Sequence, residues 1–280
     1  MPGTLYLVAT PIGNLGDLSP RAAETLGAVD FIAAEDTRVT VKLLNHLDLK
    51  KPMVSYYRHN TQTRGDEIVS RLLAGESCAL VTDAGTPAIS DPGEELVVQC
   101  AAQSIPVVPI PGACAFVNAL AVSGLPTGRF TFEGFLAMNK KNRRAHLESL
   151  AGEERTMVFH EAPHKLLPTL CDLRDTFGPD RRVSLCREMT KLHEEVRRTT
   201  LGEAAEYYSA NPPKGEFVLV VEGAPHNEGE TCTMEDGLAL AERLREEGAS
   251  TRDAVKEAAA ACKLSRKALY DLMLSKDREQ

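Results

Sequence analysis

The loop TDAGTPAISDPG, residues 82–93, directly follows the short apolar run CALV at residues 78–81. Two similar junctions flank it along the chain. The run LYLVA leads into TPIGNLGD over residues 5–17, and the run VVPI leads into PGAC over residues 107–114. Short buried strands that end in loops of glycine and proline are typical of a parallel sheet whose carboxyl edge carries the ligand site. The sequence therefore predicts a small-molecule site at that edge.

The order of apolar and helical stretches divides the chain into three parts. Residues 1–122 alternate strand-like and helical segments, which predicts a doubly wound α/β domain. Residues 123–225 are richer in strand-like runs, so we expect a second α/β domain with a mixed sheet. Residues 226–280 signal only helices after a polar linker, and a small helix-turn-helix-like domain is expected there.

The composition suits an ordinary globular protein. The chain has 280 residues, of which 43% are hydrophobic. No apolar run approaches the roughly 20 residues of a membrane-spanning helix, and the start lacks the basic stretch of a signal peptide. We therefore expect a cytoplasmic protein with no membrane association. The net charge of -8 gives no general attraction to nucleic acid, so any contact with RNA must use local basic patches.

Several local basic patches do occur in this acidic chain. Most runs of charge are solvated surface, so each patch alone is weak evidence, but several together favour RNA binding. The basic residues of the helical tail stand where a recognition-type helix is expected to begin, a position suited to phosphate contact. The candidate RNA contacts are Arg143, Arg144, Arg197, Arg198, Lys263, Arg266 and Lys267.

Two patterns that suggest a metal or a disulfide are interpreted differently here. The segment HEAPH at residues 160–164 matches the zinc-protease motif, but Pro163 falls inside the helix that this motif requires, and residues 156–159 indicate a strand. We expect a strand-to-helix turn and no metal site. The seven cysteines are scattered without the paired spacing of a zinc site, and we expect them to be reduced.

The glycine patterns of nucleotide-binding proteins are absent. No G-x-G-x-x-G follows the first expected strand, and no G-x-x-x-x-G-K-[ST] occurs anywhere. The proline-containing loops instead expose a few fixed backbone groups and allow a ligand to approach closely. We therefore expect a ligand without strong negative charge.

The motifs become specific in combination. They are TPIGNL at residues 10–15, EDTR at 35–38, TDAGTP at 82–87, PGA at 111–113, and REMTK at 187–191 with KGE at 214–216. Together they resemble the tetrapyrrole methylase superfamily, and within it the branch that methylates small-subunit ribosomal RNA. The resemblance covers the whole chain, including the helical tail.

This resemblance implies an S-adenosylmethionine-dependent enzyme of class III, commonly a homodimer, with the cofactor in a cleft between two α/β domains. It implies 2'-O-methylation of a cytidine in 16S ribosomal RNA, acting on the RNA or on the assembled small subunit. The implied cofactor contacts are Pro11, Asp83, Gly85, Thr86, Ala113, Cys114, Phe159, His160 and Glu216. Relatives often have tyrosine and serine around the glutamate of the sequence FHEA at 159–162, which weakens a role for the His160 side chain.

The expected chemistry needs a proton acceptor, because a neutral ribose hydroxyl is a poor nucleophile. We expect Glu161 or Asp36 to act as the base, ahead of His160, since burial makes a carboxylate a stronger base. Arg38 and Lys191 are candidates for gripping the RNA phosphate or for polarising the nucleophile.

Two other functions remain open at this point. One keeps the fold and changes the acceptor, giving C-methylation of a tetrapyrrole in corrin or sirohaem synthesis. The basic patches and the helical tail argue against it, because a compact macrocycle does not need them. The other is a non-enzymatic RNA-binding or ribosome-associated protein whose cleft binds no cofactor.

Overall fold

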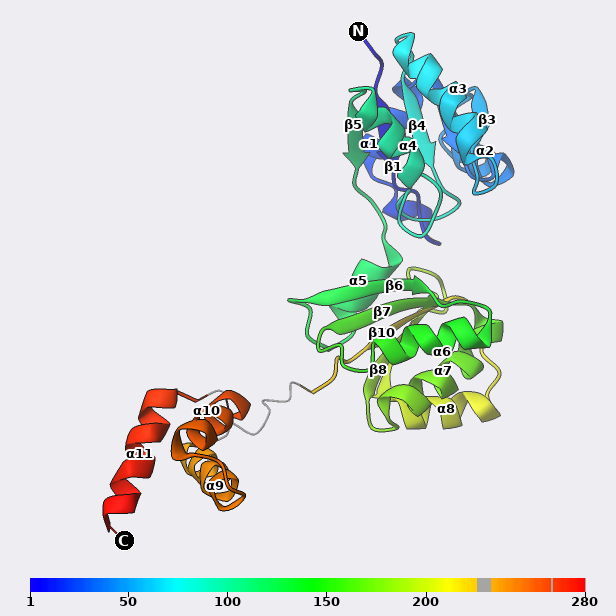
Figure 1. The fold of residues 1–280 in the computed structure, drawn as a ribbon. Coiled ribbons are helices and arrows are strands. Elements are labelled where there is room, and N and C mark those ends of the chain that lie inside the picture. Colours follow the sequence, from blue (N-terminus) through cyan, green and yellow to red (C-terminus); the bar gives the residue numbers. More distant parts are fainter. Residues whose placement is uncertain (226–232, 263, 280) are drawn as a thin grey trace. The chain divides into compact units, whose positions relative to one another are not determined.

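The computed structural model of the chain describes residues 1–225, 233–262 and 264–279 (Figure 1). The chain divides into two compact units, Met1–Ala224 and Pro225–Gln280. Both sheets belong to the first unit, and the described residues of the second unit form three helices. The expected fold class is confirmed: two α/β domains, with a small helical domain after them.

The first sheet is parallel throughout, with strand order β3-β2-β4-β1-β5. All of its strands therefore end at the same edge, as the sequence predicts. Strands β2 and β4 are buried along their whole length, which explains their unbroken apolar sequences. The strands are β1 (Leu5–Val8), β2 (Phe31–Ala34), β3 (Met53–Ser55), β4 (Cys78–Val81) and β5 (Val107–Ile110).

Helices cover both faces of this sheet, as in doubly wound folds. One face packs on α1 (Pro20–Ala28) and α2 (Thr37–His46), and the other packs on α3 (Thr61–Leu73) and α4 (Glu94–Ala102). Local sequence explains where two of these helices begin: the side chain of Ser19 caps α1 with Pro20 in its first turn, and Asp36 caps α2. A short 3-10 helix, η1 (Leu15–Asp17), lies in the loop after β1.

The second sheet is mixed, with strand order β6-β7-β10-β8-β9 and a single parallel pair, β6 with β7. This confirms the expected mixed sheet. Its centre is β10, whose five apolar residues are all buried because both faces of the sheet are covered. The strands are β6 (Phe130–Phe135), β7 (Thr156–Glu161), β8 (Arg182–Arg187), β9 (Glu195–Thr200) and β10 (Phe217–Val221).

Different helices cover the two faces of the second sheet. Alternate residues of β7, β8 and β10 pack on one face against α6 (Lys140–Ser149), α7 (Pro163–Phe177) and α8 (Leu201–Ala210). The remaining residues pack on the other face against α5 (Ala115–Val122), where Ile12 of the first domain joins the cluster. The sequence division at residue 122 groups α5 with the first domain, whereas α5 packs on the second sheet.

The C-terminal unit contains α9 (Met234–Glu246), α10 (Thr251–Ala261) and α11 (Arg266–Glu279). Thr233 and Asp236 form a capping box at the start of α9, and Ser250 caps α10. The buried part of its small core consists of three alanines with Val255, Leu269 and Met273. Among the described residues, no helix combines the length and apolarity that crossing a bilayer requires.

The cysteine prediction needs one correction. Cys262 is disulfide-bonded, so the expectation that every cysteine is reduced is wrong at this position. Scattered spacing in a sequence does not reveal which cysteines a fold brings together. The free cysteines are Cys78, Cys100, Cys114, Cys171 and Cys186, and Cys232 lies outside the described residues.

Replacing Leu219 by alanine tests whether β10 forms the centre of the second domain. The Leu219 side chain is fully buried, so Leu219→Ala should lower the free energy of unfolding by about 2–5 kcal/mol in urea denaturation. Val98 on α4 is 62% exposed, and Val98→Ala should change it by less than about 0.5 kcal/mol. Equal effects of the two substitutions would contradict the packing described here.

Candidate functional site

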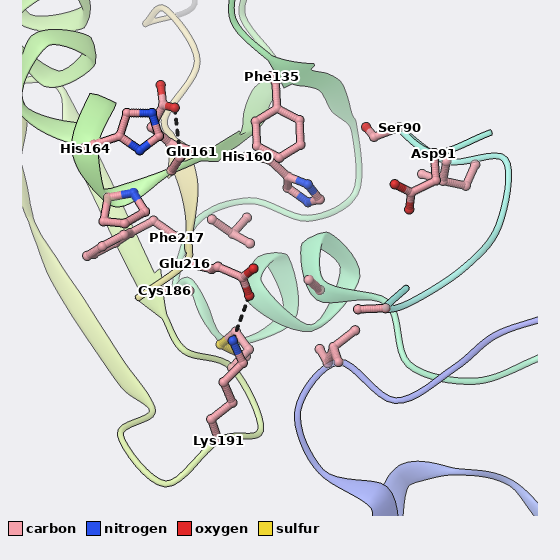
Figure 2. Close-up of a pocket in the computed structure, with 18 residues that line it drawn as sticks. Ser90, Asp91, Phe135, His160, Glu161, His164, Cys186, Lys191, Glu216 and Phe217 are labelled. Atoms are coloured by element: carbon pink, nitrogen blue, oxygen red, sulfur yellow. Dashed lines mark hydrogen bonds and ion pairs between the residues drawn. The ribbon is translucent and has the colours of Figure 1, made fainter. Parts of the chain in front are cut away.

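A cavity of about 430 Å³ lies where loops of the first domain meet strand ends of the second (Figure 2). The loops after β1 and β4 supply one wall: Ile12, Ala84, Ile89, Ser90 and Asp91. The opposite walls come from α5, from the end of β6, from the β7–α7 turn and from the strand ends of β8 and β10. Eleven of the 18 lining residues are apolar, and the other seven are polar or charged.

Hydrogen bonds between loops hold the first wall in place. Thr10 and Gly85 pair through both backbone N–H groups, at 2.9 and 3.0 Å, which joins the loop after β1 to the loop after β4. The Thr10 hydroxyl also donates to the carbonyl of Thr82. The Thr86 hydroxyl donates to the carbonyl of Ala113, which adds the loop after β5. The three loops quoted first in the sequence are therefore joined by hydrogen bonds at one sheet edge.

The loop after β4 has an unusual backbone. Ala88 and Ser90 both adopt positive φ angles, of 66° and 65°, which non-glycine residues rarely do. Such conformations concentrate at functional sites because the surrounding structure must hold them. Ile89, Ser90 and Asp91 of this segment line the cavity, so the strained backbone positions groups that face the cavity.

The turn between β7 and α7 forms the opposite wall, and it has the predicted form. Strand β7 ends at Glu161 and α7 begins at Pro163, so His160 and His164 lie on different elements. The buried carboxylate of Glu161 accepts hydrogen bonds from the Thr169 hydroxyl at 2.6 Å and from the Ala162 N–H at 2.9 Å. These bonds fix Glu161 as a brace between the turn and α7.

His160 is held in an apolar setting. Its ring makes edge-to-face contacts with Phe132 and Phe135, at centroid distances of 5.2 and 5.3 Å. Burial lowers the pKa of His160, although the nearby Glu216 charge opposes this shift. Its Nε2 atom is buried and has no hydrogen-bond partner in the described structure. A neutral imidazole with a free ring nitrogen therefore borders the cavity.

An ion-pair network closes the side of the cavity formed by the second sheet. Lys191 Nζ lies 2.7 Å from Glu216 and 2.9 Å from Glu188, and the Glu188 carboxylate also accepts from the Glu216 N–H. Burial lowers the pKa of Lys191, but its hydrogen bonds to Glu216 and Glu188 outweigh burial and raise the pKa overall. Lys191 is therefore a fixed cation whose charge is already matched within the protein.

Three carboxylates gather on the first-domain side of the site. Burial raises the pKa of Glu35, of Asp83 and of Asp91, and each is affected by a nearby like charge. The effect is largest for Asp91, whose pKa rises to about 6. Asp91 is the member of the group that lines the cavity, and the sequence interpretation missed it. The signal in the sequence was its place in the loop at residues 82–93, but Glu35 comes near Asp91 only because β2 pairs with β4.

The expected catalytic residues are not all together. Glu161 and Lys191 line the cavity, whereas Asp36 and Arg38 do not. Asp36 caps α2 and binds Arg38 through its carboxylate. These hydrogen bonds from Arg38 lower the pKa of Asp36 to about 2, which makes it a weak base. Arg38 is 89% exposed and points its charge at Asp36.

Two of the expected cofactor contacts, His160 and Glu216, line the cavity. The expected loop residues are not among the lining residues, but they lie within two positions of Ile12, Ala84 or Ala115 in the sequence. Phe159 differs, because its side chain is fully buried in the core beneath α6, α7 and α8. Phe159 does not line the cavity, and its backbone pairs with both β10 and β6. The adjoining loop residues are Pro11, Asp83, Gly85, Thr86, Ala113 and Cys114.

Several of the expected RNA contacts have partners within the protein. Arg143 and Arg144 both bind Asp172, and the Arg143 side chain is only 12% exposed. Arg197 pairs with Glu195 and stacks on Tyr207, and Arg198 donates to the carbonyls of Val122 and Ser123. Arg266 and Lys267 are exposed in the first turn of α11, and Lys263 lies outside the described residues. Four of the seven expected RNA contacts therefore bind other groups of the protein.

A parallel α/β domain followed by a mixed-sheet domain, with a ligand-sized cavity at the strand-end loops, defines a class of small-molecule-binding α/β proteins. Comparison with known proteins identifies the family within this class. Residues 4–205 match the family of tetrapyrrole (corrin/porphyrin) methylases. A solved uroporphyrin-III C-methyltransferase from Thermus thermophilus, complexed with S-adenyl homocysteine, superposes with a TM-score of 0.54 at 19% identity, covering 78% of this chain and 97% of that one.

Curated relatives are more similar. A protein from Synechocystis sp. named ribosomal RNA small subunit methyltransferase I is 50% identical, covering 97% of this chain and 98% of the relative. A protein of the same name from Halalkalibacterium halodurans is 54% identical, covering 79% of this chain and 76% of the relative. The chain belongs to the tetrapyrrole methylase superfamily and, within it, to the ribosomal RNA small subunit methyltransferase I family.

The contact between Gly13 and Lys191 gives a test of the site's architecture. Gly13 has a φ of +150°, and a Cβ there would lie 2.3 Å from Lys191 Cγ. Gly13→Ala should therefore displace the Lys191 stem and lower the free energy of unfolding by about 1–3 kcal/mol. Gly27→Ala in α1 is the matched control, because its Cβ meets Leu49 at an ordinary 3.6 Å and alanine favours a helix. Denaturation showing a more stable Gly13→Ala variant would contradict the contact.

Proposed function

We propose that this protein transfers a methyl group from S-adenosylmethionine to the 2'-oxygen of a cytidine in small-subunit ribosomal RNA. The observation that carries the proposal is the cavity at the strand ends of the first sheet, walled by loops of both α/β domains. The names of the curated relatives support ribosomal RNA as the substrate. The fold shared with a methyltransferase bound to S-adenyl homocysteine supports the donor.

The residues of the cavity suit this donor. Adenosine is neutral and needs an apolar wall with a few hydrogen-bonding groups, and Ile12, Ala115, Met189 and Val218 provide such a wall. The buried, unpartnered Nε2 of His160 provides a polar group beside it. When bound, the donor supplies an electrophilic methyl group.

The chain's own residues then have three tasks. The hydrogen-bonded loops at Thr10, Gly85 and Thr86 hold the donor, with Pro11, Asp83, Ala113 and Cys114 beside them. The Lys191–Glu216 pair fixes the far wall and orients the bound groups. A donor bound against the mainly apolar walls displaces water from the cavity, which strengthens alignment and electrostatic effects.

The substrate requires contacts outside the cavity. The ribose must leave a stacked strand to reach a donor held in a cavity, so the flanking RNA backbone needs cationic partners. We assign this role first to Arg266 and Lys267, which are exposed on α11. Arg144 is 48% exposed and is a second candidate, despite its bond to Asp172. The ribosomal substrate also supports a cytoplasmic location.

We also propose that the protein is a homodimer. Apolar side chains of α5 and β6 are exposed, with Val117 47%, Val122 39% and Phe130 40% accessible. Exposed large apolar groups that cluster on one pair of elements are typical of an interface. Sedimentation should give a dimer for the native chain and a smaller species for Val117→Lys. A native chain that sediments as a monomer at micromolar concentration would contradict the proposal.

Methyl transfer is tested with purified protein, donor labelled in its methyl group, and small ribosomal subunits. Label should appear in a single cytidine, at its 2'-oxygen, after nuclease digestion and nucleoside analysis. The rate at subsaturating RNA should fall steeply as salt rises from about 50 to 200 mM, because phosphate contacts release counterions. Label found on a base carbon or a tetrapyrrole, or no label at all, would overturn the proposal.

A further inference from the structure

The cavity contains one carboxylate whose role nothing so far explains. Three carboxylates line the cavity, and two of them are engaged. Glu161 accepts bonds from Thr169 and Ala162, and Glu216 pairs with Lys191. Within the described residues, no hydrogen bond or ion pair engages Asp91. Its oxygens are therefore free to accept a proton from a bound group.

The position of Asp91 also suits such a role. It lies between the positive-φ residue Ser90 and Pro92, so its backbone is held by a strained and rigid segment. A rigid support fixes a reacting group better than a mobile loop does. Figure 2 shows the Asp91 carboxylate pointing toward the side of the cavity that holds His160.

The second sheet approaches this segment closely. The strand β6 has a bulge at Gly134, where φ is +61°, and a Cβ at Gly134 would lie 3.3 Å from Ser90 Oγ. A glycine in this conformation lets the bulge come close to the loop. Phe135 follows directly and lines the cavity beside Asp91 and His160. Asp91 is partly buried and shares the cavity with groups of both domains.

We propose that Asp91 is the general base of the methyl transfer that we assign to this site. Asp91 takes the proton of the ribose 2'-hydroxyl as that oxygen forms its bond to the methyl carbon. The carbon–sulfur bond breaks with its electron pair going to sulfur, so the donor leaves as a neutral thioether. The proton ends on the Asp91 carboxyl group, and no other reactant is needed. This inference rests on the proposed function.

The surrounding charges support the proton-accepting role. Burial, then the charges of Glu35 and Asp83, raise the pKa of Asp91 to about 6, against a smaller opposing effect of Arg58. Across the cavity, His160 is neutral near pH 7 because burial lowers its pKa, and Lys191 is paired with Glu216. A base works best when its pKa lies near the working pH. Asp91 meets this condition, whereas Asp36, with a pKa of about 2, does not.

Asp91→Asn tests the proposal by kinetics on small subunits at saturating donor. The rate should fall by about 10²–10⁴-fold, and the rise of the native rate through a pH of about 6 should disappear. Donor affinity by calorimetry should stay within about threefold. Asp180→Asn is the matched control, because Asp180 is exposed in the turn before β8 and should leave the rate unchanged. Glu161→Gln is assayed in the same way, so that the effect of removing the Asp91 charge is compared with the effect of removing the charge of Glu161, which braces the turn between β7 and α7.

A second readout needs neither donor nor RNA. The folded-state pKa of Asp91 is raised from 3.8, so its ionised form opposes folding, and this cost appears as pH rises from about 4 through about 6. Asp91→Asn should therefore melt at a higher temperature than the native protein at pH 7.5, with the difference vanishing near pH 4. A variant that is less stable at pH 7.5 would show a structural carboxylate and overturn the proposal.

The outcomes separate the proposal from the function on which it rests. A native chain that does not methylate small subunits overturns the proposed function and the role of Asp91 with it. An active native chain with a variant rate within tenfold overturns the role of Asp91 alone. Weaker donor binding by more than tenfold with an unchanged saturated rate also overturns it, because Asp91 would then be a binding group. Loss of the rate with retained donor affinity and raised stability supports it.

Discussion

The pairing of Thr10 with Gly85 is the constraint on which the site depends. Two backbone hydrogen bonds join the loops after β1 and β4, whose strands are neighbours in the first sheet. The chain leaves β1 toward one edge of the sheet and leaves β4 toward the other, which opens a crevice between their loops. The bonds to Thr10 keep both loops in one position, so the cavity wall exists before a ligand arrives.

The second domain completes this crevice and fixes its chemistry. The face of its sheet that α5 covers turns Val218, Cys186 and Met189 toward the first domain, and Ile12 packs among them. On this side, Lys191 neutralises one of the two carboxylate charges of Glu188 and Glu216. On the other side, burial and mutual repulsion favour protonation of the carboxylates Glu35, Asp83 and Asp91. The walls of the cavity are therefore mainly apolar, and the carboxylates on the first-domain side are stronger bases than exposed carboxylates.

The sequence predicts the fold well because its signals are local. Buried parallel strands such as residues 78–81 are continuous apolar runs, and the glycine and proline loops mark their ends. The strand-to-helix turn at residues 160–163 follows from Pro163, which is placed at the first turn of α7. Packing is a longer-range property: α5 follows β5 in sequence, yet its apolar surface suits the second sheet, which no local pattern reveals.

The site is only partly predictable for the same reason. His160, Glu161, Lys191 and Glu216 stand at strand ends, so their approach to the cavity follows from strand order. The partners of a side chain do not follow from it. Glu161 is tied to Thr169, Asp36 to Arg38, and Arg143 to Asp172, and each bond becomes visible only in the folded chain. The sequence does not single out Asp91, because its raised pKa comes from burial and from the charges of Glu35 and Asp83, which the fold brings near it.

A crystal structure of the protein with S-adenosylhomocysteine is the most direct test of a methyl-donor site between the two α/β domains. The account predicts the ligand in the cavity, with its adenosine against Ile12, Ala115 and Val218 and its sulfur facing the space next to Asp91 and His160. Ligand bound elsewhere on the chain, or crystals that show none at saturating concentration, would contradict it.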